Sequence, residues 1–321
     1  MEQRKLVTVI GATGMQGGSV IKHLLDHTSE YSIRAVTRNH CSTAAKNLIT
    51  RGVEVVQADL WDINSLIEVF RGSYAIFGVT NFWKIFEHAS KEVAAAQETE
   101  QGKNIVDAAT TTLGTLQQFI WSTLADTASI SDGDYIVPHY QSKVAVNHYI
   151  ESKPELFAKT TFLWCSYYAA NLTRACLEPV YIPTADKYIQ IQGVPEDTPM
   201  AFIGDTAENL GAFVKAILDQ PGKTGKGKTV FAYIERTTLG EILQSWARVH
   251  GVKAQYVQVS KETYCALFGR QAKEMDLGMT FWDHARNKDW TATNGIMTYR
   301  AIGVDLSRLL GPEQSMAMLP L

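Results

Sequence analysis

Apolar residues in the first half of the chain form short runs that alternate with longer amphipathic stretches. The runs predict strands, because strands buried in a parallel sheet read as continuous apolar segments. Six strands are expected, at residues 5–10, 32–38, 53–60, 74–80, 117–123 and 160–165. The stretches between them predict helices at 16–27, 42–51, 62–70, 90–112 and 139–152. Ser42 or Thr43 is the expected N-cap of the second helix, and Asp62 that of the third.

This alternation predicts an α/β fold with a doubly wound parallel Rossmann sheet, since parallel strands need crossover helices that cover both faces. The alternation of strands and helices becomes less regular after residue 165, where four prolines interrupt the pattern, Pro179, Pro183, Pro195 and Pro199. It resumes with a helix at 209–220, a strand at 229–235, a helix at 238–251 and a strand at 254–260. We therefore expect a Rossmann domain at 1–165. A smaller mixed α/β portion at 166–321 would fold over the carboxyl edge of the main sheet and interleave with it.

A glycine-rich loop joins the first strand to the first helix. The segment VTVIGATGMQGGSV places Gly11, Gly14 and Gly17 in a G-x-x-G-x-x-G spacing. Gly11 permits a tight turn, Gly14 lets a phosphate approach the backbone, and Gly17 lets the helix pack on the strand. The helix N-terminus then offers unpaired N–H groups to a pyrophosphate. The loop predicts a dinucleotide site, with a tight turn that binds no ligand as the alternative.

The end of the second strand indicates which dinucleotide is bound. An NAD site carries a carboxylate about twenty residues past the loop, on the ribose 2′-hydroxyl. This chain has Thr37-Arg38-Asn39-His40 there, without a carboxylate. An arginine at this place can pair with a 2′-phosphate. Arg38 therefore favours NADP(H) over NAD, and the alternative is a solvated surface arginine.

Residues 222–229, GKTGKGKT, match the P-loop pattern G-x-x-x-x-G-K-T. A phosphate-binding P-loop follows a strand and precedes a helix. Here a helix and Pro221 come before the segment, and a strand comes after it. Its N–H groups would face a helix C-terminus, which disfavours phosphate. We interpret the segment as a flexible basic loop and expect no ATP site.

Composition and charge exclude several further classes of ligand and site. Thirty Lys and Arg stand against 33 Asp and Glu in 321 residues, a net charge of −3, so nucleic acid is not an expected ligand. No apolar run is long enough for a membrane span, and no signal peptide follows Met1, so a cytoplasmic location is expected. The four cysteines lack C-x-x-C spacing and the histidines lack ligand spacing, so we expect free thiols and no metal site.

Several segments carry a resemblance to a known family. They are the glycine loop, AVTRN, VVQADL, IFGVTNFW, EQGKNIVDAA, FIWSTL, PHYQSKVAVNHYI and DTAENLGAFVKAIL. Together they span most of residues 5–220 and resemble the NmrA-like family, an atypical branch of the extended short-chain dehydrogenases. The resemblance implies NADP(H) above the sheet of residues 1–165 and a substrate-binding portion at 166–321. It leaves the activity open, because the family includes redox-sensing regulators as well as reductases of secondary metabolism.

Cofactor contacts are expected from the loop and from the carboxyl ends of the strands. Asp59, in QADL, lies where an adenine contact is usual, and a helix N-cap is the other interpretation. The full set of expected cofactor residues is Gly11, Thr13, Gly14, Met15, Gln16, Gly17, Arg38, Asp59, Leu60, Thr80, Asn81 and Lys143.

The helix at 139–152 begins with HYQSK, which places Tyr140 and Lys143 on one helical face. The resemblance to short-chain dehydrogenases implies that this Y-x-x-K pair holds the cofactor ribose and supplies a proton. The ammonium of Lys143 would lower the pKa of Tyr140. Ser122 occupies the position of the substrate-orienting serine, with Thr123 as a rival. Many NmrA-like regulators resemble this segment but carry Phe in place of Tyr140, so the tyrosine favours chemistry. The alternatives are a helix-entry aromatic ring for Tyr140 and a surface lysine for Lys143.

The substrate pocket can be placed from the segment WCSYYAANL after the sixth strand. Tyr167, Tyr168 and Asn171 would give it an aromatic wall with polar tips, and Phe82 and Trp83 would close the other side. These rings suit an aromatic substrate, but they suit a hydrophobic core equally well.

Three functions remain compatible with these residues. The first is an NADPH-dependent reductase that acts on a C=O, C=C or C=N bond of a small aromatic or polycyclic metabolite. The second is a non-catalytic NADP(H) sensor that binds a protein partner. The third is an acid-catalysed rearrangement in which Tyr140 donates a proton without net hydride transfer. Tyr140 favours the first and third.

Overall fold

The computed structural model describes residues 4–288 and 295–321. A seven-stranded sheet forms its larger part. The strands are β1 (Lys5–Val9), β2 (Tyr31–Thr37), β3 (Glu54–Gln57), β4 (Ala75–Gly78), β5 (Gln118–Thr123), β6 (Thr160–Cys165) and β11 (Lys228–Ala232). Their order is β11-β6-β5-β4-β1-β2-β3, and every neighbouring pair is parallel. This confirms the predicted doubly wound Rossmann sheet.

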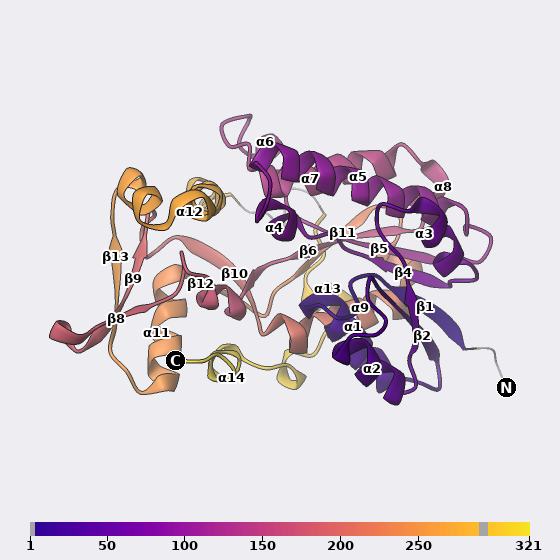
Figure 1. Cartoon of the computed structure of the whole chain (residues 1–321), viewed down its shortest axis with the longest axis horizontal. Coiled ribbons are helices and arrows are strands. Elements are labelled where there is room, and N and C mark those ends of the chain that lie inside the picture. The colour runs from indigo at the N-terminus through magenta and orange to yellow at the C-terminus, as the bar shows by residue number, and fades with distance from the viewer. Residues whose placement is uncertain (1–3, 289–294) are drawn as a thin grey trace.

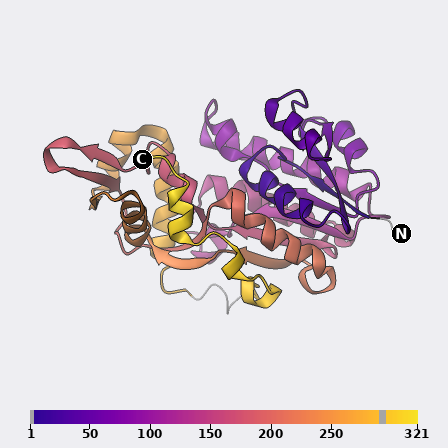
Figure 2. The same cartoon turned by 90° about the horizontal axis from the view of Figure 1, so that it is seen from below.

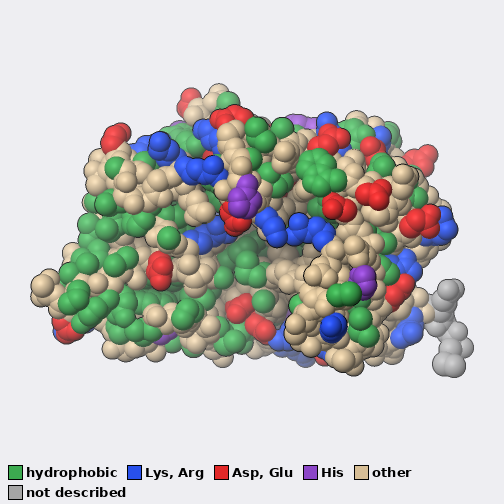
Figure 3. Space-filling view, in the orientation of Figure 1, with side chains coloured by type: hydrophobic (Ala, Val, Ile, Leu, Met, Phe, Trp, Pro, Cys, Tyr) green, Lys and Arg blue, Asp and Glu red, His purple; other side chains and the backbone are tan. Residues whose placement is uncertain are grey.

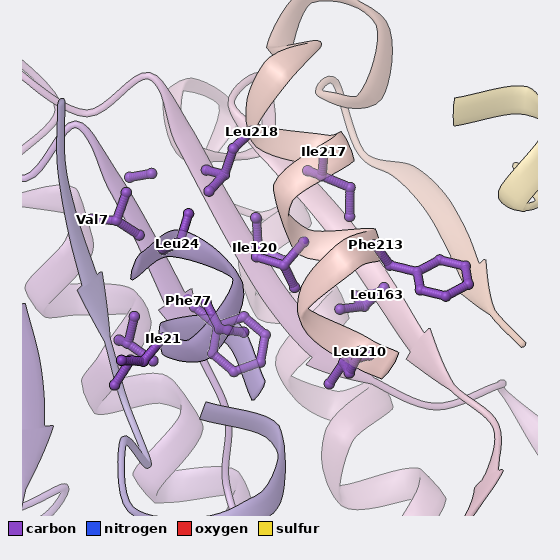
Figure 4. Packing of buried hydrophobic residues seen from close by; sticks show 14 of the residues in the cluster. Val7, Ile21, Leu24, Phe77, Ile120, Leu163, Leu210, Phe213, Ile217 and Leu218 are labelled. Carbon is purple, nitrogen blue, oxygen red and sulfur yellow. The ribbon is translucent and has the colours of Figure 1, made fainter. Parts of the chain in front are cut away.

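Helices cover both faces of this sheet (Figure 1). One face carries α1 (Met15–Leu25), α2 (Thr43–Thr50), α9 (Thr206–Asp219) and α13 (Tyr299–Ile302). The other carries α3 (Ile63–Phe70), α5 (Lys91–Thr110), α7 (Pro138–Glu151) and α8 (Pro154–Phe157). Figure 4 shows how side chains of α1 and α9 pack on those of the sheet, among them Leu24, Phe77 and Phe213. Burial of this apolar surface is the main stabilising contribution to the sheet.

Side-chain caps and turns determine where several elements begin and end. The Ser42 side chain accepts a hydrogen bond from the N–H of Ala45 and caps α2. Asp62 caps α3 in the same way. The predicted strand at 53–60 was too long, since β3 ends at Gln57. The physical reason is a turn in which the Asp59 carboxylate accepts a hydrogen bond from the N–H of Trp61.

The second part of the molecule contains two small mixed sheets. One consists of β7 (Tyr167–Tyr168), β10 (Pro199–Gly204) and β12 (Glu235–Thr238), and the other of β8 (Val180–Ile182), β9 (Lys187–Gln192) and β13 (Ala254–Gln258). Helices α11 (Leu239–His250), α12 (Lys261–His284) and α14 (Pro312–Ala317) pack with them. Figures 1 and 2 place the two parts side by side along the long axis. Between β10 and β12 the chain returns to the main sheet as α9 and β11. Within the described residues, no helix is both long and apolar enough to cross a membrane.

The P-loop-like segment lies on this return path. Helix α10 (Pro221–Thr224) contains the first glycine of the segment, Gly222, and precedes Gly225 and Gly227, and β11 begins at Lys228. Gly227 adopts a left-handed φ of 68°, and a Cβ there would lie 2.2 Å from the Phe157 ring. The helix–loop–strand order agrees with the sequence analysis. The glycine serves packing against α8 at this position.

We expect Lys228→Ala to change the free energy of unfolding by less than about 0.5 kcal/mol, because Lys228 is exposed at the start of an edge strand. ATP should not bind to the native protein or to the variant. Urea unfolding and calorimetric titration with ATP would check both statements. Saturable ATP binding that disappears in Lys228→Ala would contradict our interpretation of the loop.

Candidate functional site

A cavity of about 660 Å³ opens at the carboxyl ends of the main strands. It lies where β1 and β4 are neighbours and the strand order reverses, which is the usual binding crevice of an open α/β sheet. Figure 3 shows a hollow in the middle of one face, with Lys and Arg side chains beside it. The cavity is lined by every residue that the sequence assigned to a site: Gly11, Thr13, Gly14, Met15, Gln16, Gly17, Arg38, Asp59, Leu60, Thr80, Asn81, Phe82, Trp83, Ser122, Thr123, Tyr140, Lys143, Tyr167, Tyr168 and Asn171. The structure brings them together, and their individual roles remain predictions.

The glycine loop has the geometry that a pyrophosphate needs. Gly11 has a φ of 67°, and a Cβ on Gly17 would lie 2.4 Å from the carbonyl oxygen of Gly11, so no larger residue fits there without a backbone shift. Gly14 is the N-cap of α1 and supplies no side chain to the free N–H groups of the first turn. The first turn also carries no acidic residue. The N-terminus of α1 therefore fits an anionic group, as a dinucleotide would supply.

Arg38 follows the end of β2 and is exposed, and it pairs with no carboxylate in the described part of the chain. Its guanidinium is thus available to an anion at the rim of the cavity. Asp59 also lines the cavity. It is not the N-cap of α3, which is Asp62, so the N-cap interpretation of Asp59 was wrong.

Lys143 forms a buried ion pair that the sequence analysis missed. Its Nζ donates to Glu98 Oε1 at 2.9 Å and to Thr80 Oγ1 at 3.0 Å. Glu98 is fully buried and also accepts hydrogen bonds from the hydroxyls of Thr80 and Ser142. A signal was present in the sequence, because Glu98 lies four residues before Gly102, whose missing side chain makes room for Val146 of α7. That spacing places Glu98 on the face of α5 that packs against α7.

Tyr140 is buried in the wall of the cavity, where Trp282 Nε1 donates a hydrogen bond of 2.9 Å to its hydroxyl oxygen. Burial raises the pKa of Tyr140 to about 12, the hydrogen bond from Trp282 opposes this, and the nearby charge of Glu274 adds to it. We had expected Lys143 to lower this pKa, and that expectation was wrong. The physical reason is that the phenol lies in a desolvated wall, and the ammonium of Lys143 donates to Glu98 and Thr80 instead.

A short hydrogen-bond chain connects Ser122 with the glycine loop. Ser122 Oγ donates to Gln16 Oε1 at 2.6 Å, and Gln16 Nε2 donates to the Tyr168 hydroxyl at 2.7 Å. The hydroxyl of Thr123 is buried and has no hydrogen-bond partner among the described residues. Both candidate residues at the end of β5 therefore line the cavity, and Ser122 is the one already oriented by a neighbour.

His139 and Glu274 form a second buried pair at the start of α7. The carboxylate oxygen Oε1 of Glu274 lies 2.6 Å from His139 Nδ1 and accepts the backbone N–H of His139 at 3.0 Å. A carboxylate beside the first turn of a helix is favoured by the helix dipole. The imidazole packs against Trp83 and Tyr140, with ring centres 4.9 and 4.7 Å apart. This pair fixes the first turn of α7 and with it the place of Tyr140.

Helix α12 supplies Glu274 and much of the cavity wall, through Met275, Gly278, Met279 and Trp282. No helix or strand was predicted from the sequence after residue 260. The reason is that α12 buries Glu274 and Asp276 along with its apolar residues, and Gly269 interrupts it with a non-helical φ of 68°. The clean apolar stripe that identifies an amphipathic helix is therefore missing.

Comparison with known proteins places the chain among relatives of the same architecture. The sequence model of the NmrA-like family matches residues 3–296. An NmrA-like family domain-containing oxidoreductase, cpsB of Aspergillus campestris, is 28% identical over 267 residues, which cover 80% of this chain and 76% of that protein. The crystal structure of NmrA, a negative transcriptional regulator in complex with NADP, superposes with a TM-score of 0.74 at 19% identity and covers 99% of this chain and 96% of that chain. Triphenylmethane reductase of Citrobacter sp., complexed with NADP(H), gives 0.65 at 18% identity and covers 97% and 98%. The two structures support the fold.

Proposed function

We propose, from the premise that this chain belongs to the NmrA-like family, that it is an NADPH-dependent oxidoreductase of the short-chain dehydrogenase type. Its substrate would be a small aromatic or polycyclic metabolite, in which it reduces a C=O, C=C or C=N bond as a step of secondary metabolism. The observation that carries the proposal is Tyr140, a protonated and oriented phenol that lines the same cavity as an uncapped helix N-terminus. A relative named as an oxidoreductase and a structural neighbour named as a reductase support it.

The residues present fit the cofactor. The first turn of α1 would hold the pyrophosphate, Arg38 the 2′-phosphate, and Lys143 the nicotinamide ribose. NADPH supplies the hydride when it is bound. Asn81 and Asp59 would border the cofactor from the strand ends on either side of the loop.

The chain itself supplies the proton. Trp282 donates to the Tyr140 oxygen, so the phenolic proton is left for another acceptor, and none is found among the described residues. A substrate oxygen, nitrogen or carbon that gains electron density during reduction would take this proton from Tyr140 Oη. Ser122, held by Gln16, would orient the same substrate atom. The apolar wall formed by Trp83, Tyr167 and α12 would exclude water from the reaction.

Arg38→Ala should remove most of the preference for NADPH over NADH. A charge-assisted hydrogen bond contributes about 1.5–3 kcal/mol, so the affinity for NADPH should fall about ten- to a hundredfold while that for NADH stays unchanged. Calorimetric titration of both cofactors against both proteins would measure this. Equal affinities for NADPH and NADH in the native protein would overturn the assignment of the cofactor.

A further inference from the structure

We propose that Arg174 binds an anionic group of the substrate, so that the natural substrate is an aromatic or polycyclic compound that carries a carboxylate. This inference rests on the proposed function, because it concerns the substrate end of the same cavity. Arg174 follows the 3₁₀-helix η1 (Ala169–Thr173) and lines the cavity. Nothing in the sequence pattern had singled it out.

The guanidinium of Arg174 is held in place but not neutralised. Its carbon Cζ lies 4.8 Å from the centre of the Trp83 ring, in a cation–π arrangement. Its Nε donates to the Asn171 side-chain oxygen at 3.3 Å. No carboxylate lies within ion-pair distance of it in residues 4–288 and 295–321, although the side chain is half-buried. Four N–H donors of the planar guanidinium therefore remain for a ligand, and their geometry suits a carboxylate.

The other charged residues that line the cavity are neutralised, exposed or placed at the cofactor end. The lining residues that carry a charge are Arg38, Asp59, Lys84, Lys143 and Arg174. Lys143 is compensated by the buried Glu98, and Asp59 and Arg38 follow the ends of β3 and β2, where the adenosine end of a dinucleotide would lie. Lys84 is exposed. Arg174 is thus the uncompensated cation next to the apolar wall, and its partial burial makes its attraction for an anion stronger than in bulk water.

The position of Arg174 relative to Tyr140 suits a ring-sized substrate. Arg174 stacks on Trp83, Trp83 contacts His139, and His139 contacts Tyr140, each step between 4.7 and 4.9 Å. A planar substrate that packs on Trp83 would reach the guanidinium with one end and the phenol with the other. The carboxylate would then fix which bond of the substrate lies next to Tyr140.

The test uses the full chain loaded with NADPH and two probes of equal shape, naphthoate and its neutral amide naphthamide. Calorimetry should show that the native protein binds naphthoate about ten- to a hundredfold more tightly than naphthamide, as expected for charge-assisted hydrogen bonds. Arg174→Met should abolish this difference and leave the affinity for naphthamide unchanged. Arg270→Met is the matched control, because Arg270 also stacks on an aromatic ring, Phe86 at 4.4 Å, but does not line the cavity. This control should keep the full preference.

The remaining outcomes separate this inference from the proposed function. Equal binding of the two probes by the native protein, or no detectable binding of naphthoate, would overturn the inference. A preference that persists in Arg174→Met would overturn it too. If Arg174→Met instead weakens NADPH binding and keeps the preference for naphthoate, Arg174 serves the cofactor and the inference is wrong. Failure of the native protein to bind NADPH would refute the proposed function itself.

Discussion

Tyr140→Phe should lower the turnover number about 10²–10⁴-fold, the usual contribution of general acid–base catalysis. The change removes the hydroxyl that would donate the proton and keeps the ring that packs against His139 and Phe281. It also removes the 2.9 Å hydrogen bond from Trp282, worth about 0.5–1.5 kcal/mol of stability, so the protein should remain folded. Steady-state rates of NADPH oxidation with a panel of aromatic ketones, enones and cyclic imines would measure the loss. The affinity for NADPH should be unchanged.

Tyr264→Phe is the control for this experiment. Its hydroxyl donates a 2.7 Å hydrogen bond to the Cys176 carbonyl in a buried region, but the side chain does not line the cavity. The control should lose similar stability and no turnover. A true substrate that Tyr140→Phe reduces at the native rate would contradict the role of Tyr140. Product formation without NADPH consumption would indicate the acid-catalysed rearrangement, and a protein that binds NADPH but converts none of the panel would favour the sensor.

The raised pKa of Tyr140 has a consequence for the pH dependence of the rate. With a pKa of about 12, the phenol stays protonated throughout the neutral range, so its ionisation should not reduce the rate between about pH 6 and 9. The folded state holds this proton more tightly than the unfolded state, whose phenol has a pKa near 10. The resulting stabilisation is present below about pH 10 and is lost as the pH rises through 12. A rate that falls with an apparent pKa near 7 in the native protein, but not in Tyr140→Phe, would contradict this assignment.

The main sheet could be predicted from the sequence because its signals are local. Continuous apolar runs mark β4, β5 and β6, and side-chain caps such as Ser42 and Asp62 mark the beginnings of helices. The strands of the second part could not be predicted in the same way. Three of its strands, β7, β8 and β12, have only two to four residues, which is too short for a recognisable apolar run. Which of these segments pair is decided by tertiary packing, and no residue within a segment specifies its partner.

The residues of the candidate site likewise fall into those that local motifs predict and those that depend on distant partners. The glycine loop, Arg38 and the Y-x-x-K spacing are contiguous patterns, so sequence reasoning found them and the fold brings them to one cavity. Glu98 and Glu274 were missed because a buried carboxylate looks like any helical glutamate until its partner is known. Both partners lie in α7. Lys143, the partner of Glu98, comes 45 residues after it, and His139, the partner of Glu274, comes 135 residues before it. The electrostatics of Tyr140 and Lys143 therefore depend on residues that no local motif includes.

Glu98→Leu should lower the free energy of unfolding by about 3–5 kcal/mol, the usual cost of removing one partner of a buried ion pair. Glu98 is fully buried and the side chain of Lys143 is 12% exposed, so the ammonium would keep its charge in a poorly solvated place. The hydroxyls of Thr80 and Ser142 would lose their carboxylate acceptor as well. Urea unfolding would measure the change. Glu100→Leu, on an exposed position of the same helix, should change the stability by less than about 0.5 kcal/mol.

The double variant Glu98→Leu with Lys143→Met separates the charge from the packing. Apolar residues of similar size often replace a buried ion pair without loss, so the double variant should recover much of the stability that Glu98→Leu alone loses. It should still bind NADPH weakly, because the ammonium expected on the ribose is gone. If Glu98→Leu costs less than about 1 kcal/mol, water or another group solvates Lys143 in the folded state. The buried pair of Lys143 and Glu98 would then contribute little to stability, and the cost that we assign to an uncompensated ammonium at this place would be wrong.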